Sequence, residues 1–300
     1  MLQINNLSYR YRPSSPWVLQ DIQLAIPRQG VLGLIGHNGA GKSTLLSLLA
    51  GLYSLERGEI RNSDGESLSS RDLIKLVSIV PQDFAFYQEL PVQQNLQLFN
   101  AISTAKHKAN SINKAVEICL LSKLLKKPVT QLSGGQKRKL NLAIGLLKPA
   151  TVLLLDEPTV GIDPESKREL LDAIKALANE GMSIVYTSHI LSEVEQICDE
   201  ICILHEGKLK LAPTTLNQLD ENPRALLQLQ TAADKDKLDP IFKNIAVNWV
   251  NQHTAVIENL NTSFAELLNR IEQAGVQLRS SSFGTGALEQ LYFSLTQESP

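Results

Sequence analysis

The fold is decided by the stretch Gly36-His37-Asn38-Gly39-Ala40-Gly41-Lys42-Ser43-Thr44, which fits the phosphate-binding pattern G-x-x-x-x-G-K-[ST]. A short apolar, β-rich run precedes it at 31–35, and helix-forming residues follow it at 45–50. The motif therefore lies between a predicted strand and the start of a predicted helix, where backbone N–H groups lack partners within the helix. A phosphate chain can accept hydrogen bonds from these groups, and the helix dipole favours its negative charge.

The side chains of this loop suit a nucleotide with a metal ion. Lys42 is expected to reach the β- and γ-phosphates, and the Ser43 hydroxyl to bind Mg²⁺. Glycines allow the backbone to approach the phosphates and to adopt positive φ. The loop residues predicted to contact the nucleotide are Gly36, Asn38, Gly39, Ala40, Gly41, Lys42, Ser43 and Thr44.

Composition narrows the class of protein. The chain has 300 residues, 43% of them hydrophobic and 20% charged, as in ordinary globular proteins. Its net charge of −2 gives no global reason to expect nucleic-acid binding. We find no apolar run of the roughly 20 residues that a membrane-spanning helix needs, and no signal peptide, so we expect the chain in the cytosol.

The three cysteines, Cys119, Cys198 and Cys202, fit a reducing compartment. Cys198 and Cys202 lie four residues apart with His205 following, which makes a metal site conceivable. A fourth ligand is not evident nearby, so we expect small core residues at a helix end and in the next strand.

Residue patterns predict an α/β domain followed by a smaller one. Strands are expected at 2–11, 17–26, 31–35, 59–61, 76–80, 151–155, 183–187, 201–204 and 208–211, the first two antiparallel. Helices are expected at 45–50, 92–102, 109–125, 137–147, 164–179 and 191–197, so a helical insert occupies about 90–147. We expect the first domain to cover 1–213 and a linker to cover 214–224. An α+β domain should follow at 225–300, with strands at 225–230, 246–250, 254–258 and 275–280 and helices at 262–273 and 287–296.

Four further motifs narrow the chemistry. Leu132-Ser133-Gly134-Gly135-Gln136 opens a helix, and Asp156-Glu157-Pro158 ends an apolar strand some twenty residues later. Gln82 and His189 each follow a predicted strand closely. In this order the set resembles the ATP-binding-cassette (ABC) family over about 1–212. The resemblance implies a P-loop NTPase fold with a RecA-like core, an antiparallel β subdomain and a helical insert.

The resemblance also implies roles in ATP hydrolysis, which needs a metal, a positioned water and compensation of γ-phosphate charge. Asp156 would hold Mg²⁺, and Glu157 would orient or deprotonate the attacking water. Gln82 would touch the metal and the water. His189 would bind the γ-phosphate, although a lone histidine is more often a core residue.

In the family, the loop that includes Ser133, Gly134, Gly135 and Gln136 binds the γ-phosphate of an ATP held by the opposite subunit. The chain carries one copy of each motif, so the resemblance implies a head-to-tail homodimer, or a heterodimer with another ABC ATPase, that encloses two ATPs. Asp163 matches a loop that communicates across this interface. The same residue could simply cap the helix that starts at Pro164.

An aromatic residue near the end of the first strand is expected to stack on adenine, because stacking needs only a flat ring. We favour Tyr11 over Tyr9, since Tyr11 lies nearer the strand's end. Ile144 and Ile162 depart from commoner family residues, an arginine and a leucine, at positions outside the expected chemistry.

Three tasks are compatible with an active ATPase: driving a membrane transporter, a soluble non-transport role such as iron–sulfur cluster assembly, or a nucleic-acid-linked role. Absent coiled-coil heptads and near-neutral charge weaken the last. The ending 282–296 loosely resembles that of ABC-2 type exporter ATPases, whose membrane subunits are separate chains. That resemblance predicts a peripheral protein on the cytoplasmic face of the membrane. A cleft beside Gln82 should receive a short permease helix, with Phe84, Phe86 and Tyr87 as candidate anchors.

Overall fold

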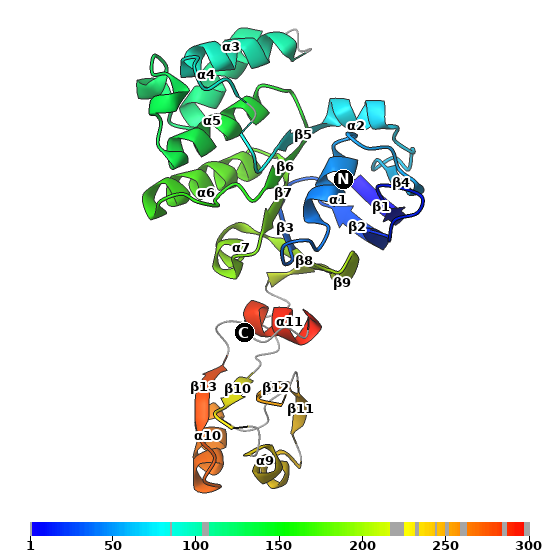
Figure 1. Cartoon of the computed structure of the whole chain (residues 1–300), viewed down its shortest axis with the longest axis vertical. Coiled ribbons are helices and arrows are strands. Elements are labelled where there is room, and N and C mark those ends of the chain that lie inside the picture. Colours follow the sequence, from blue (N-terminus) through cyan, green and yellow to red (C-terminus); the bar gives the residue numbers. More distant parts are fainter. Residues whose placement is uncertain are drawn as a thin grey trace. The chain divides into compact units, whose positions relative to one another are not determined.

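The computed structural model describes residues 2–84, 86–103, 108–216, 225–231, 234–243, 245–249, 252–258, 263–283 and 287–296. Contacts between residues divide the chain into two compact units, Met1–Pro213 and Thr214–Pro300 (Figure 1). Most of the predicted linker, at 217–224, lies outside the described residues.

The first unit is built on a six-stranded sheet. Its strand order is β5 (Val77–Val80), β6 (Val152–Asp156), β7 (Ser183–Ser188), β3 (Gly30–Ile35), β8 (Glu200–His205) and β9 (Lys208–Thr215). The five strands from β5 to β8 are parallel. Every residue of β6 and β7 is buried, as expected for parallel strands covered on both faces.

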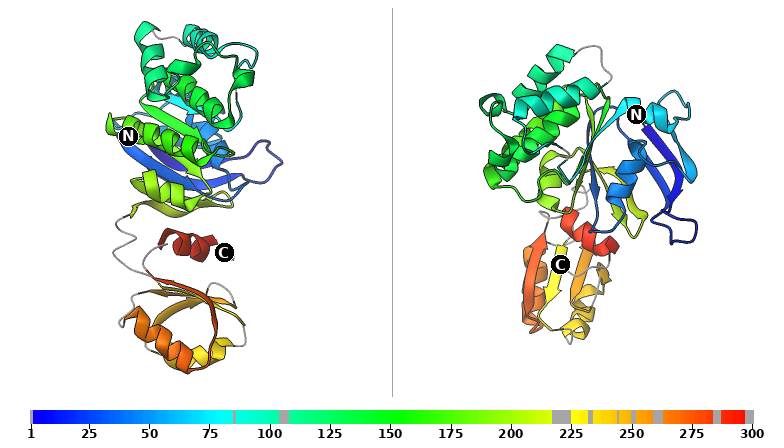
Figure 2. Two further views of the ribbon diagram at one scale, coloured as in Figure 1. Left: turned by 90° about the vertical axis from the view of Figure 1, so that its left-hand side faces the viewer. Right: turned by 45° about the horizontal axis from the view of Figure 1, so that its top comes forward.

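Helices cover both faces of this sheet. Figures 1 and 2 show α1 (Lys42–Leu49) on one face, and α6 (Pro164–Asn179) with α7 (Leu191–Ile197) on the other. Because parallel strands end at the same edge, the loops after β3, β5, β6 and β7 meet there. This edge is where ligands bind in open α/β sheets.

A second, antiparallel sheet packs on the far side of α1. Its order is β2 (Leu19–Ile26), β1 (Leu2–Tyr9) and β4 (Arg57–Arg61). The buried side chains of this sheet share one hydrophobic core with those of α1 and the central sheet. The predicted antiparallel pairing is confirmed. However, β1 ends at Tyr9 rather than residue 11, because the chain turns at 11–15 before Pro16.

The segment 92–147 is helical, as predicted. It contains α3 (Val92–Ile102), α4 (Lys108–Ile118), two short 3-10 turns, and α5 (Gly134–Leu146), with no strand among its described residues. The helix expected at 109–125 ends early, since Leu120 adopts a left-handed conformation with φ 55°. Helix α2 (Ser70–Leu76) was not predicted, and it starts with a capping box between Ser69 and Asp72. Leu76 belongs to this helix, so the strand predicted at 76–80 begins at Val77.

The second unit has the order β10 (Ala225–Leu229), α9 (Lys235–Phe242), β11 (Ala246–Trp249), β12 (Thr254–Glu258), α10 (Phe264–Gln273), β13 (Leu278–Phe283) and α11 (Ala287–Thr296). The antiparallel sheet order β11-β12-β10-β13 makes a split β-α-β, ferredoxin-like arrangement. Helix α9 was not predicted, because Pro240 within it argues against a helix. Strand β13 starts three residues later than expected, since Gly275 ends α10 with φ 72°.

None of the described helices in either unit is long and apolar enough to cross a membrane.

Candidate functional site

The phosphate-binding motif joins β3 to α1, as predicted. Gly41 is the N-cap residue of α1 with φ 107°, and no side chain caps the helix. The first N–H groups of α1 are therefore left for a bound anion. At Gly36 a Cβ atom would lie 2.4 Å from the backbone oxygen of Leu204, so only glycine fits there.

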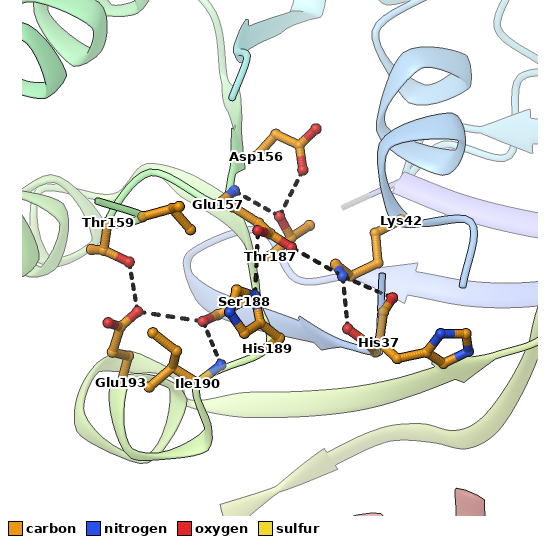
Figure 3. A network of polar contacts seen from close by, with 12 residues as sticks. His37, Lys42, Asp156, Glu157, Thr159, Thr187, Ser188, His189, Ile190 and Glu193 are labelled. Carbon is orange, nitrogen blue, oxygen red and sulfur yellow. Dashed lines mark hydrogen bonds and ion pairs between the residues drawn. The ribbon is translucent and has the colours of Figure 1, made fainter. Parts of the chain in front are cut away.

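Lys42 curls back over the loop. Its Nζ donates to the backbone oxygens of Gly36 (2.7 Å) and His37 (3.2 Å). It also lies 3.1 Å from Oε1 of Glu157 at the end of β6 (Figure 3). His189, just after β7, completes the group with its Nδ1 3.3 Å from Oε2 of Glu157. Three strand ends thus bring Lys42, Glu157 and His189 together, and the first two are almost fully buried.

Thr187 links the two carboxylates of the predicted Asp156-Glu157 pair. Its hydroxyl donates to Oδ1 of Asp156 (2.9 Å) and accepts from the backbone N–H of Glu157 (2.9 Å). Glu157 adopts a left-handed backbone with φ 45°, a strained conformation that points to a functional constraint. The sequence gives no sign of this role for Thr187, because threonine is common in ordinary β-strands.

A second buried carboxylate holds α7 against β7. Glu193 accepts hydrogen bonds from Thr159 (2.6 Å) and Tyr186 (2.8 Å), and Lys167 Nζ lies 2.6 Å from it. Burial raises the pKa of Glu193, but the hydrogen bonds from Lys167, Thr159 and Tyr186 outweigh burial and leave the pKa below its ordinary value. The Ser188 hydroxyl also reaches Glu193 (3.3 Å), which fixes the chain next to His189.

Ser133 is the N-cap residue of α5 and forms a capping box with Gln136. Gly135 packs so closely on α6 that a Cβ atom would lie 2.1 Å from Oγ of Ser166. Asp163 caps α6 by accepting from the Ser166 N–H (2.9 Å), so its capping role is confirmed. Across the described ranges, no hydrogen bond or ion pair joins 133–136 to the Lys42–Glu157–His189 group.

Gln82 follows β5, as predicted, but its side chain is exposed and makes no hydrogen bond to Asp156 or Glu157 among the described residues. Its backbone oxygen accepts from Arg138 on α5. The burial of Arg138 could not be predicted from the sequence, because a cation inside a helix gives no signal of burial. Ser43 is exposed at the first turn of α1.

A cluster of three tyrosines flanks the phosphate loop. The Tyr11 hydroxyl lies 2.8 Å from Oγ1 of Thr44, and its ring contacts Tyr9 and Tyr53 edge to face. Tyr11 is 55% exposed and can offer a ring face to a base, which favours it over the half-buried Tyr9. Tyr53 was not predicted, since it follows α1 and is distant from Tyr11 in sequence.

Cys198 and Cys202 are buried, as expected of core residues. Cys202 lies in β8, and burial raises its pKa to about 12. Throughout the described part of the chain, no group of three or more His, Cys, Asp or Glu side chains could hold a metal ion.

Comparison with known proteins agrees with this geometry. The family model described as "ABC transporter" matches residues 19–160. The lantibiotic transport ATP-binding protein SrtF of Streptococcus pyogenes is 38% identical over 216 residues, which are 70% of this chain and 90% of that protein. The chain belongs to the ABC transporter family. Another relative, the bacitracin transport ATP-binding protein BcrA of Bacillus licheniformis, is 35% identical, with 72% of this chain and 70% of the relative covered.

A solved structure of the ATP-binding subunit of an ABC transporter has a similar fold, with a TM-score of 0.64 and 27% identity over 74% of this chain and 92% of that one. The expected P-loop α/β fold is therefore confirmed. The chain is an ABC ATPase that binds and hydrolyses ATP for transport.

The Glu193 network predicts how stability depends on pH. Glu193→Gln should cost about 2 kcal/mol near neutral pH, because charge-assisted hydrogen bonds are lost. Since the folded-state pKa is lowered, this stabilisation is complete above the ordinary pKa of 4.5 and is lost as pH falls through the folded value. Urea unfolding from pH 7 to pH 3 should show the gap between wild type and variant closing below pH 4.5. A gap that stays constant to pH 3 would contradict the assignment.

Proposed function

We propose that two copies of this ATPase, or this chain and a related cassette, close head to tail on two Mg–ATP and drive export through separate membrane subunits. One observation supports a dimer: the residues expected to bind one ATP do not all lie together in a single chain. Glu157 contacts both Lys42 and His189, whereas the exposed Ser133 at the start of α5 has no described hydrogen bond or ion pair with any of the three. A helix N-terminus suited to an anion is therefore left for the ATP of another subunit.

Each residue of the group has a proposed task. Lys42 leaves its loop carbonyls to bind the β- and γ-phosphates, as a point charge on a flexible stem can. Glu157 then orients the attacking water and accepts its proton, with its carboxylate held at the strained end of β6. His189 donates to the γ-phosphate, and Tyr11 stacks on the adenine.

The oxygen donors of this edge fit Mg²⁺. Asp156, Ser43 and Gln82 offer carboxylate, hydroxyl and amide oxygens, the donors that Mg²⁺ prefers. Thr187 orients the Asp156 carboxylate toward this role through its hydrogen bond. The ion would neutralise charge developing on the phosphates. Gln82 must turn inward to take part.

The names of the relatives support the transport task. Both are transport ATP-binding proteins, one for a lantibiotic and one for bacitracin, so a non-transport assembly such as iron–sulfur cluster building is not favoured. We propose an exporter of the ABC-2 type, with the chain on the cytoplasmic face of the membrane and the 225–300 unit as an accessory domain. The cargo would pass through the membrane subunits.

An apolar groove of about 690 Å³ offers a docking surface for the permease. It lies between α2, α3 and α5 beside Pro81, and its lining includes Leu52 (60% exposed), Ile74 (47%) and Ile102 (68%). Large exposed apolar side chains gathered in one groove indicate an interaction site. Of the aromatic anchors expected from the sequence, Phe84 and Tyr87 are exposed. Phe86 is only 8% exposed and stacks on Phe84, so it packs the loop instead.

Glu157→Gln should abolish hydrolysis while ATP binding persists, because the amide keeps the shape of the pocket but cannot take a proton. We expect turnover to fall at least about a hundredfold and the variant to run as an ATP-dependent dimer in gel filtration. Turnover close to wild type would remove Glu157 from the role of base.

Ile74→Glu should prevent docking, since a docked permease would bury the new carboxylate and the loss of its hydration is costly. The ATPase activity of the isolated chain should stay within about twofold of wild type. Binding to salt-washed inside-out membranes of the source organism measures docking. Leu120→Glu is the matched control, because Leu120 is also exposed (57%) but does not line the groove. Equal binding of both variants would exclude this groove as the docking surface.

A further inference from the structure

Arg138 is a buried guanidinium to which the proposed mechanism gives no task. It lies on α5, five residues after Ser133, and is 8% exposed. Burial lowers its pKa, and the nearby carboxylates of Asp83 and Glu157 act in the opposite direction. Burying a charged group costs free energy unless hydrogen bonds and opposite charges compensate, so the contacts of Arg138 indicate what it does.

Those contacts join three segments of the site. Nη1 donates to the backbone oxygen of Gln82, and Nη2 donates to the backbone oxygen of Val160 (3.2 Å). The guanidinium also lies 4.7 Å from the ring centroid of Phe84. A planar guanidinium can hold two carbonyls and a ring face in one fixed geometry, whereas a lysine ammonium cannot.

One nitrogen of the Arg138 side chain takes no part in these contacts. Its Nε is buried and has no hydrogen-bond partner in the described part of the chain. Buried donors without partners are rare. The Nε–H group can therefore donate to a further acceptor if the Gln82 and Val160 loops shift around it.

We propose that Arg138 is a positioning residue that ties the Gln82 loop to the helix beginning at Ser133. Ser133 is the proposed contact with the ATP of the other subunit, and α5 is a rigid helix between it and Arg138. Binding of that ATP moves α5, and the guanidinium carries the movement to Gln82 and to the segment before Asp163. Each ATP is in this way sensed at the metal site of the opposite subunit. The inference rests on the roles proposed for Gln82 and Ser133.

Arg138→Lys keeps the positive charge but removes the planar guanidinium that holds the two backbone oxygens. We expect kcat for ATP to fall at least about tenfold, because small misplacement of a catalytic group is costly, and KM to stay within about twofold, because the Lys42 loop is untouched. Arg168→Lys is the matched control, since Arg168 is exposed on α6. A wild-type kcat in a folded Arg138→Lys chain overturns the proposal.

A double-mutant cycle separates positioning from mere structural support. If Arg138 acts in part through Gln82, adding Arg138→Lys to Gln82→Ala should lower kcat by a smaller factor than Arg138→Lys lowers it in the wild-type chain. Independent effects would multiply, and that result also overturns the proposal. Thermal unfolding of each variant shows whether the chain is folded.

If Arg138→Lys does not fold, Phe84→Leu tests the proposal instead. This substitution removes the aromatic ring under the guanidinium, and Phe84 is 38% exposed, so the chain should still fold. Its kcat should fall about threefold, as expected for loss of a cation–π contact, and an unchanged kcat overturns the proposal. The Glu157→Gln variant separates failure of the proposed ATPase mechanism from failure of the Arg138 proposal. If the mechanism is wrong, Glu157→Gln hydrolyses ATP. If only the role of Arg138 is wrong, Glu157→Gln stays inactive.

Discussion

The site depends on an ammonium and a carboxylate, Lys42 and Glu157, that face each other 3.1 Å apart and are almost fully buried. Removing two such charges from water is expensive, and a fold tolerates it only where further hydrogen bonds satisfy both groups. Lys42 has the two carbonyls of its own loop, and Glu157 has His189. The parallel sheet makes this possible, because it ends β3, β6 and β7 at one edge.

The meeting of strand ends at one edge of the parallel sheet also explains which features could be predicted from the sequence. The phosphate loop fixed β3 and α1, and the apolar run before Asp156 fixed β6 as a strand buried on both faces. Strands β3 and β6 both lie beside β7 and run parallel to it. Because parallel strands end at the same edge of the sheet, Lys42, Glu157 and His189 lie close together. The motifs therefore predicted the fold of the first unit and the residues gathered at its edge.

Other features could not be predicted, for identifiable physical reasons. Thr187 bonds to the Asp156 carboxylate and the Glu157 N–H, and Arg138 donates to two backbone oxygens. Such contacts leave no trace in the spacing of residues along the sequence. Helix α9 contains a proline, and α2 is so short that only its capping box marks it. Gln82 was predicted at the metal, but its side chain points outward here. Gln82 lies in the loop after β5, so the direction of the strand does not determine where its side chain points.

Mixing two inactive variants tests most directly whether each ATP site is shared by two chains. Lys42→Ala disables the phosphate loop, and Ser133→Arg disables the opposing helix start. Either variant alone should be inactive, but a mixed dimer contains one site with both halves intact. An equal mixture should recover about a quarter of wild-type ATPase activity, because half of the randomly paired dimers are mixed and each has one of two sites. A mixture that stays as inactive as its components would contradict the shared site.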